Sequence, residues 1–320
     1  MKRLTLPLVT LAMLFTGISA QAASDHTYAS KKNGGPYPTF DCSLANPCSS
    51  LQDAINQANS PGIVTITDGE FDEAITIAHT VSLQAYEGVG IILRPPASGT
   101  AITINAGTSD KVNIVGLEIT GLSTGSTGIL FNSGLGLFMR NVTLSGFTDV
   151  AINFAPNTSP AGGVPAQLGM KDSVIAQNTN GNVLIKPSNS VLASVNFKRV
   201  TIRNSVYGIR ADDSAGSGLI KVDVTDLGAF NHSNNGFLAV GTGTGPVHFM
   251  IDRCAAQNNG TYGAVATGSN AFMILSNSTI VSNATGVAQL SGSTVAMPGN
   301  NVVNFNTTNI TGTITSISLH

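Results

Sequence analysis

The sequence predicts an all-β fold, a single-stranded parallel β-helix whose coils each contain three short strands. Two observations lead to this prediction. One segment design recurs at a nearly constant interval after residue 110, and its apolar residues alternate every second position, which is the period of a strand. A repeat of roughly 20 to 50 residues is typical of solenoids. Hydrophobic residues at 42%, with charged residues at only 10%, exclude a disordered chain.

Each repeat begins with an apolar anchor, continues with two polar residues and then places small or apolar residues at the third and fifth positions. Successive anchors are separated by 25, 31, 27, 27, 27 and 24 residues, at Ile114, Met139, Met170, Phe197, Val224, Ile251 and Leu275. One unit contains the strand-like pieces 195–197, 200–202 and 209–211, with the corner Lys198-Arg199 between the first two. Such pieces, stacked about 4.8 Å apart on their equivalents, form a β-helix. A β-sandwich would predict no fixed register between units.

The first residues indicate export. Lys2 and Arg3 precede an apolar run over residues 4–18, and Ala20 and Ala22 form an A-x-A cleavage site. This pattern predicts a signal peptide over residues 1–22, and the run is too short for a membrane span. A buried N-terminal helix is the alternative. We therefore expect a periplasmic or extracellular protein with no transmembrane segment after cleavage.

An exported chain makes its cysteines interpretable, because disulfides persist in oxidising compartments. Cys42 and Cys48 predict a small disulfide loop within an N-terminal segment, residues 23–48. A metal site is the weaker alternative, because zinc is usually bound by four ligands and no third or fourth ligand residue lies near these two cysteines in the sequence. Cys254 is left over and occupies a core-facing position of its repeat, so we expect an inert buried thiol.

The β-helix domain, residues 49–320, is expected to open with a capping helix. Ser50 to Asp53 read as a capping box for a helix through about Ala58. Leu51, Ala54, Ile55 and Ala58 share one face of that helix, and this apolar stripe can plug the first coil. The proline and glycine at 61–62 are expected to end the helix, with the first strand at residues 63–66.

These residues together resemble a known family. The pattern Cys-x5-Cys, then Ser-Leu-Gln-Asp-Ala-Ile, then Val-Thr-Ile and Asn- and Gly-rich coils is similar to secreted bacterial right-handed parallel β-helix proteins of the pectin-lyase-like superfamily. The resemblance covers roughly residues 40–310 and implies a right-handed coil. It implies no single activity, because the superfamily includes lyases, glycosidases, esterases, epimerases and adhesins. The calcium-cluster, paired-Asp and Gly-His-Gly signatures of its pectate lyases and polygalacturonases are missing from this sequence.

The two-residue corner predicts a column of polar side chains along the rod. One residue from each coil contributes to it: Asn141, Asp172, Arg199, Asp226, Arg253 and Asn277. The middle four alternate in charge, so neighbours one coil apart can pair. Asparagine at such corners resembles the asparagine ladder of the pectate-lyase-like folds. We interpret the column as structural, since neutralised pairs explain it without catalysis.

A second face holds the candidate catalytic residues. Arg210 is expected to point outward from its strand, which ends in Asp212 and Asp213, and the preceding coil aligns Lys186 near Asp212. Carboxylates beside cations are the groups that uronate chemistry needs, as water activators, Ca²⁺ ligands or proton acceptors. Arg203 and Tyr207, in the adjoining loop, are candidate substrate-binding residues. The competing interpretation is a surface ion pair and an acidic turn. The long excursion over residues 154–167 could form one wall of a cleft here.

Two functions therefore remain open. The first is an exported, non-catalytic binding or structural scaffold in the envelope or outside the cell, with a carbohydrate or envelope component as partner. The second is a polysaccharide lyase or glycoside hydrolase that acts on a uronate-containing polymer. We expect no metal and no cofactor, with Ca²⁺ considered only for a lyase. Nucleic-acid binding is excluded, because 15 scattered Lys and Arg residues cannot make a large basic patch.

Overall fold

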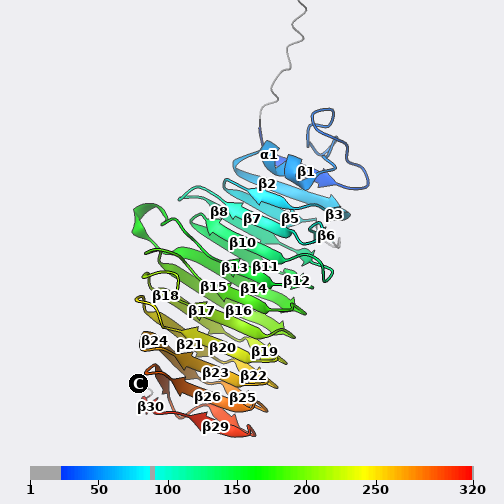
Figure 1. The fold of residues 1–320 in the computed structure, drawn as a ribbon. Coiled ribbons are helices and arrows are strands. Elements are labelled where there is room, and N and C mark those ends of the chain that lie inside the picture. The colour runs from blue at the N-terminus through cyan, green and yellow to red at the C-terminus, as the bar shows by residue number, and fades with distance from the viewer. Residues whose placement is uncertain (1–22, 87–90, 319–320) are drawn as a thin grey trace, which may run out of the picture.

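The computed structural model describes residues 23–86 and 91–318, and the expected signal peptide lies outside them. The described chain is a rod of stacked coils (Figure 1). Its strands form one 20-stranded and one 10-stranded sheet, and neighbouring coils pair in parallel, as between β14 (Ala166–Ala176) and β16 (Ala193–Arg203). The predicted parallel β-helix is confirmed. Among the described residues, no helix is long and apolar enough to cross a membrane.

The 10-stranded sheet receives one strand from each coil. Its members are β4 (Ile75–Ile77), β7 (Thr100–Asn105), β10 (Thr127–Ser133), β13 (Val150–Phe154), β15 (Gly181–Ile185), β17 (Tyr207–Asp212), β20 (Asn235–Val240), β23 (Tyr262–Thr267), β26 (Thr285–Leu290) and β29 (Thr308–Thr311).

The 20-stranded sheet receives the other two strands of each coil, which run on as one bent strand in β14 and β16. Its remaining members are β1 (Ser24–Ser30), β2 (Ala58–Asp68), β3 (Glu70–Asp72), β5 (Val81–Ala85), β6 (Ile91–Arg94), β8 (Lys111–Val115), β9 (Leu117–Thr120), β11 (Gly136–Arg140), β12 (Thr143–Ser145), β18 (Ile220–Thr225), β19 (Gly228–Phe230), β21 (Val247–Asp252), β22 (Ala255–Gln257), β24 (Ala271–Ser276), β25 (Thr279–Val281), β27 (Thr294–Met297), β28 (Val302–Asn304) and β30 (Ile314–Ser316).

The repeat anchors stack in one column through the core. Each pairs with the anchor of the next coil, from Ile114 beside Met139 to Ile251 beside Leu275, and all seven are buried. Deviations from the 27-residue spacing are absorbed in loops, because a slip of one residue would turn every core side chain outward.

The bend between the two strands of the large sheet is made by one residue in the left-handed conformation. All six residues of the predicted polar column have φ between 50° and 54°. Residues on both sides of this corner remain in strand geometry, so Lys171 and Asp172 both face solvent before Ser173 returns to the interior. The corner therefore projects the column outward as a ridge along the rod.

Helix α1 (Leu51–Gln57) lies at the N-terminal end of the rod (Figure 1) and buries Leu51, Ala54 and Ile55. The Ser50 hydroxyl accepts from the N–H of Asp53 at 3.2 Å. In place of the second half of the expected capping box, a side chain from the next coil caps the helix. Glu73 accepts from the Leu51 N–H at 2.7 Å and from the Ser50 hydroxyl at 2.9 Å.

Two boundaries at this end differ from the prediction. The helix ends at Gln57, next to the predicted end near Ala58, but the proline and glycine do not end it, because the N–H of Ala58 already bonds to the Ile55 carbonyl and the chain turns extended there. Strand β2 therefore begins at Ala58. In addition, β1 within the N-terminal segment pairs with β2. The disulfide between Cys42 and Cys48 is confirmed, and it closes the loop just ahead of the helix.

Candidate functional site

The corner ridge carries two ion pairs. Arg199 Nε lies 2.6 Å from Asp172 Oδ1, and Arg253 Nε lies 2.9 Å from Asp226 Oδ1. Each arginine thus reaches back by one coil, while Arg253 also contacts Asp252. The hydrogen bond from Arg199 lowers the pKa of Asp172. The charges along the ridge are therefore paired rather than clustered by sign.

The two asparagines at the ends of the ridge do not join this pairing. Asn277 Nδ2 donates to Asp252 Oδ1 at 2.8 Å instead of to its ridge neighbour. The backbone N–H of Asn141 donates to the Lys171 carbonyl at 3.2 Å. The column is consequently two separate salt-bridged pairs flanked by asparagines.

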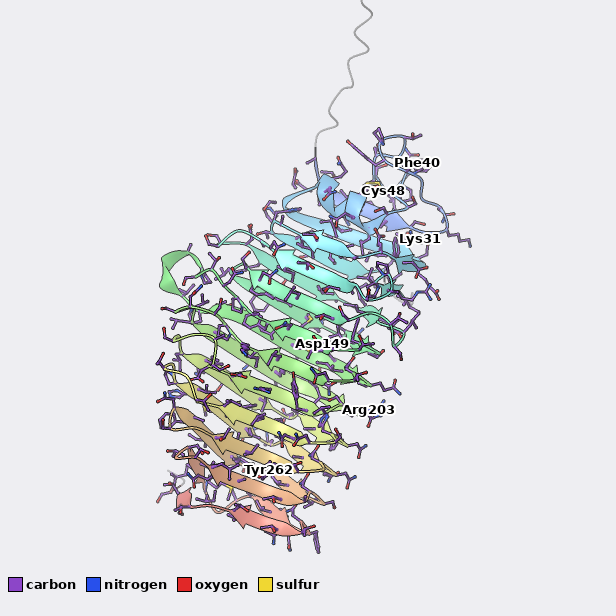
Figure 2. All side chains as sticks on the ribbon, in the orientation of Figure 1. Lys31, Phe40, Cys48, Asp149, Arg203 and Tyr262 are labelled. Atoms are coloured by element: carbon purple, nitrogen blue, oxygen red, sulfur yellow. A yellow bond between two sulfur atoms is a disulfide. The ribbon has the colours of Figure 1, made fainter. Side chains whose placement is uncertain are left out.

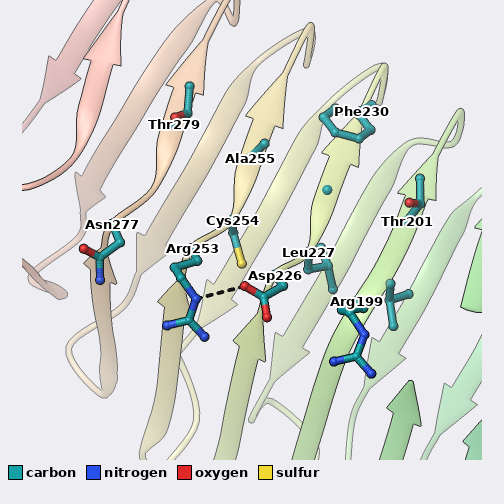
Figure 3. Close-up of a pocket in the computed structure, with 12 residues that line it drawn as sticks. Arg199, Thr201, Asp226, Leu227, Phe230, Arg253, Cys254, Ala255, Asn277 and Thr279 are labelled. Atoms are coloured by element: carbon teal, nitrogen blue, oxygen red, sulfur yellow. Dashed lines mark hydrogen bonds and ion pairs between the residues drawn. The ribbon is translucent and has the colours of Figure 1, made fainter. Parts of the chain in front are cut away.

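A shallow groove of about 590 Å³ runs beside this ridge (Figure 3). Its floor consists of one small outward residue from each of four successive coils, namely Thr201, Gly228, Ala255 and Thr279. Because these residues pair in register across β16, β19, β22 and β25, the floor follows the rod axis. The volume lies in the range of ligand pockets.

Phe230 borders the groove opposite the ridge, and its ring lies over the backbone of Gly228. A Cβ placed on Gly228 would come within 2.2 Å of the ring, so only glycine allows this position. The ring is half-buried, so part of it is available to solvent. A flat apolar surface of this kind is suited to stacking.

Arg199 and Arg253 retain hydrogen-bonding capacity toward the groove. A guanidinium has five N–H donors. The Asp172 pair uses Nε and Nη2 of Arg199, and the aspartate contacts of Arg253 use Nε and Nη1. Nη1 of Arg199 and Nη2 of Arg253 therefore have no acceptor in the described part of the chain. Both side chains are about half exposed.

The candidate catalytic residues lie at the end of β17. Arg210 Nε donates to Asp212 Oδ2 at 3.0 Å, and the N–H of Ser214 donates to Asp212 Oδ1 at 2.9 Å. Burial alone would raise the pKa of Asp212, but the Ser214 and Arg210 bonds lower it overall. Asp212 is 1% exposed, so in this conformation it anchors the turn that follows β17.

Asp213 has a different environment. Its Oδ1 accepts from the N–H of Gly243 at 2.7 Å, while its buried Oδ2 has no hydrogen-bond partner among residues 23–86 and 91–318. Burial raises the pKa of Asp213, the Asp212 charge adds to this, and bonds from the Gly243 and Thr242 N–H groups oppose it.

The other candidates are only partly assembled around these acids. The register sets Ile185 beside Ala211, which brings Lys186 level with Asp212, yet the described structure contains no ion pair between them. Tyr207 packs its ring over Gly181 in the preceding coil, and burial raises its pKa to about 12. Arg203 is exposed at the margin of the rod where β16 ends (Figure 2).

The excursion after β13 does not approach Arg210. It includes the short helix η1 (Ala161–Gly163), and the Ala161 N–H donates to the Thr108 carbonyl at 3.0 Å. Thr108 follows β7, whereas Arg210 lies on β17, on the other side of β13. The loop therefore folds toward the N-terminal coils and builds no wall over the acids.

The described residues offer few groups for metal binding or thiol chemistry. Within the described ranges, no three His, Cys, Asp or Glu side chains are grouped to hold a metal ion. Cys254 is free and buried, as predicted, and burial raises the pKa of its thiol to about 12.

The groove was not recognised in the sequence, although the ridge beside it was. Its floor residues have no common chemistry, so only the register between coils reveals that they share one column. The signal available was the second position after each corner residue, where β16, β19, β22 and β25 repeatedly place a small residue.

No protein-family model and no curated protein matches the chain. Among solved structures, XylC in complex with xylose is similar at 7% identity with a TM-score of 0.53, over 88% of this chain and 70% of XylC. Pectin methylesterase PemA from Erwinia chrysanthemi has 12% identity and a TM-score of 0.37, over 79% and 89% of the two chains. An alginate lyase from Paenibacillus has 13% identity and a TM-score of 0.37, over 91% and 99%.

At these identities the similarity shows the fold alone. The architecture expected from the sequence, a parallel β-helix, is confirmed.

Proposed function

We propose that the protein is an exported, non-catalytic β-helix that binds an acidic polysaccharide along the groove beside the corner ridge. The observation that carries this proposal is the groove itself. Its floor of small residues leaves room for an extended ligand, the Phe230 ring offers a stacking face, and two arginines on the ridge retain free N–H donors.

The groove suits a chain of sugars laid parallel to the rod axis. Four floor residues, one per coil, span about 14 Å at the usual strand spacing. Free guanidinium N–H groups can bond sugar hydroxyls or a uronate carboxylate, which arginine recognises in bidentate geometry. An aromatic ring covers the apolar face of a pyranose. A ligand of this class thus matches each part of the groove.

Three of the lining residues, Arg199, Arg253 and Cys254, have pKa values that suit binding rather than proton transfer. The hydrogen bond to Asp172 raises the pKa of Arg199, and the bond to Asp226 raises that of Arg253. Burial raises the pKa of the Cys254 thiol to about 12. These groups keep their protons near neutral pH, whereas a general acid or base must exchange its proton there.

Two further observations agree with an exported carbohydrate-binding protein. One of the structures similar in fold, XylC, was determined with xylose, so a rod of this architecture can hold a sugar. The disulfide is compatible with an oxidising compartment, which the signal-like residues 1–22 also indicate.

The test is affinity electrophoresis and calorimetry of the whole protein with polygalacturonate, alginate and neutral glucans, alongside an absorbance assay for unsaturated uronate products. We expect an acidic polymer to bind without product formation. Phe230→Ala and Arg253→Ala should each weaken binding by about tenfold. Arg94→Ala is the matched control, because Arg94 forms the same kind of ion pair with Asp72 several coils away. Failure of every acidic polymer to bind, or an equal loss in Arg94→Ala, would contradict the proposal.

A second candidate function is a lyase or hydrolase that uses the end of β17. The specific observation in its favour is Asp213, whose pKa is raised and whose buried Oδ2 has no partner among the described residues. Acids with these properties cluster at catalytic sites. The same absorbance assay separates the two candidates. Product formation that Asp213→Asn and Arg210→Ala abolish, with or without added Ca²⁺, would establish the enzyme and overturn the non-catalytic proposal.

A further inference from the structure

A second hollow is built on strands β1, β2 and β5, which lie at the opposite end of the rod from the last coils (Figure 1). It measures about 550 Å³ and is lined by His26, Tyr28, Thr65, Gln84, Ala85 and Tyr86. Tyr28, Thr65 and Gln84 pair in register as one row across three coils. The hollow is therefore built on sheet residues, which hold their side chains in fixed positions.

Three aromatic side chains, His26, Tyr28 and Tyr86, line this hollow. The His26 and Tyr28 rings are stacked, with centroids 4.5 Å apart and planes 21° from parallel. Tyr86 also lines the hollow, and its side chain is 61% exposed. Exposing a tyrosine to this extent leaves both its ring face and its hydroxyl free for a ligand.

Polar groups at the base of the hollow are held by one another. The Thr65 hydroxyl lies 2.7 Å from His26 Nε2 and accepts from Gln84 Nε2 at 3.0 Å. These contacts fix the amide of Gln84, whose Oε1 accepts no hydrogen bond from the described residues. A preorganised acceptor beside aromatic faces favours a ligand with hydroxyl donors.

The hollow carries no Lys, Arg, Asp or Glu among its lining residues. It thereby differs from the groove, which is lined by Arg199, Asp226 and Arg253. A carboxylate-bearing sugar would find no Lys or Arg here. From the stacked rings, the fixed amide and the missing charges, we propose that this hollow is a binding site for a neutral pyranose residue of an oligosaccharide, independent of the acidic-polymer groove.

The test is calorimetry of the whole protein with cellotetraose, mannotetraose and β-1,4-galactotetraose, and with tetragalacturonate as the acidic counterpart. We expect at least one neutral tetrasaccharide to bind. Tyr86→Ala and Gln84→Leu should each weaken it by about tenfold or more, while Tyr86→Phe keeps most of the affinity. Because the chain has no Trp, tyrosine fluorescence gives a second readout.

Two control variants separate this site from the groove. Phe305→Asn removes an exposed ring at the far end of the rod, and Phe230→Ala alters the groove; both should leave neutral-sugar binding unchanged. Tyr86→Ala should likewise leave tetragalacturonate binding unchanged. The inference is overturned if no neutral tetrasaccharide binds, or if binding survives Tyr86→Ala and Gln84→Leu at full strength. A groove that failed to bind acidic polymer would leave these outcomes unaffected.

Discussion

At the scale of single residues, His232 is the buried group whose ionisation the fold opposes. It is 1% exposed. The Ser205 hydroxyl donates to the Tyr207 carbonyl and so accepts from His232 Nδ1–H at 2.9 Å, while the buried Nε2 has no partner in the part of the chain that the structure describes. The imidazole is thus neutral in the core, and burial lowers its pKa from 6.5 to about 4.

This shift predicts an acid-sensitive stability. The unfolded chain binds a proton near pH 6.5 and the folded chain only near pH 4, so stability falls as pH decreases through that window. The full loss would be up to about 3 kcal/mol. The aspartates with lowered pKa values lose their contribution only below about pH 4, outside the window. Urea unfolding at several pH values should show this slope in the wild type and in His248→Asn, an exposed control. His232→Asn should flatten it, and a slope that persists would refute this role.

A second residue-scale prediction concerns the left-handed corners. Gln177, Asn204, Asn231, Asn258, Ser282 and Phe305 form another column of positive φ. Asparagine tolerates this conformation, whereas bulky and β-branched residues are strained by about 1 kcal/mol or more. Asn258→Val should therefore destabilise the protein by about 1 kcal/mol, and Phe305→Asn should stabilise it by about 0.5 kcal/mol, as measured by urea unfolding. Equal signs for the two changes would contradict the conformational explanation.

At the scale of elements, the N-terminal cap depends on a side chain from another coil. Glu73 accepts from the first turn of α1 and from the Ser50 hydroxyl, where its charge also favours the helix dipole. Glu73→Ala should cost about 1–2 kcal/mol of unfolding free energy. Glu118→Ala removes an exposed acid from β9 and should cost much less. If the two variants unfold alike, Glu73 does not stabilise the helix.

The individual strands show which parts of the fold the sequence predicts and which it does not. The coils after residue 110 were predictable because their anchors recur and must stack to bury their apolar faces. Strand β1 was missed because it lies before the repeats, and its partner β2 follows a disulfide loop and a helix. The hollow on β1, β2 and β5 was missed for the same reason, since Tyr28, Thr65 and Gln84 form one row only when these strands are in register. Glu73 was not predicted as a capping residue of α1, because the sequence also contains a local candidate for that role, Asp53.

At the scale of the whole molecule, the rod resembles a one-dimensional stack in which each coil contacts only its neighbours. This separates the two proposed sites energetically as well as spatially. The groove lies on the later coils, and the hollow lies on the first ones. Binding at one site has no contiguous rearrangement through which to alter the other, so the two ligands should bind independently.

The same architecture predicts a gradient of local stability along the rod. An inner strand such as β17 is almost entirely buried, whereas β28, β29 and β30 are mostly exposed. Opening the end coil therefore exposes little apolar area, while opening an inner coil breaks two interfaces. Hydrogen exchange at neutral pH should be fastest in β28–β30 and slowest in β15, β17 and β20. At the other end, α1 covers the first coil, so β2 should exchange more slowly than β28. Uniform exchange across all strands would show instead that the rod opens as a single cooperative unit, and the nearest-neighbour description would then be wrong.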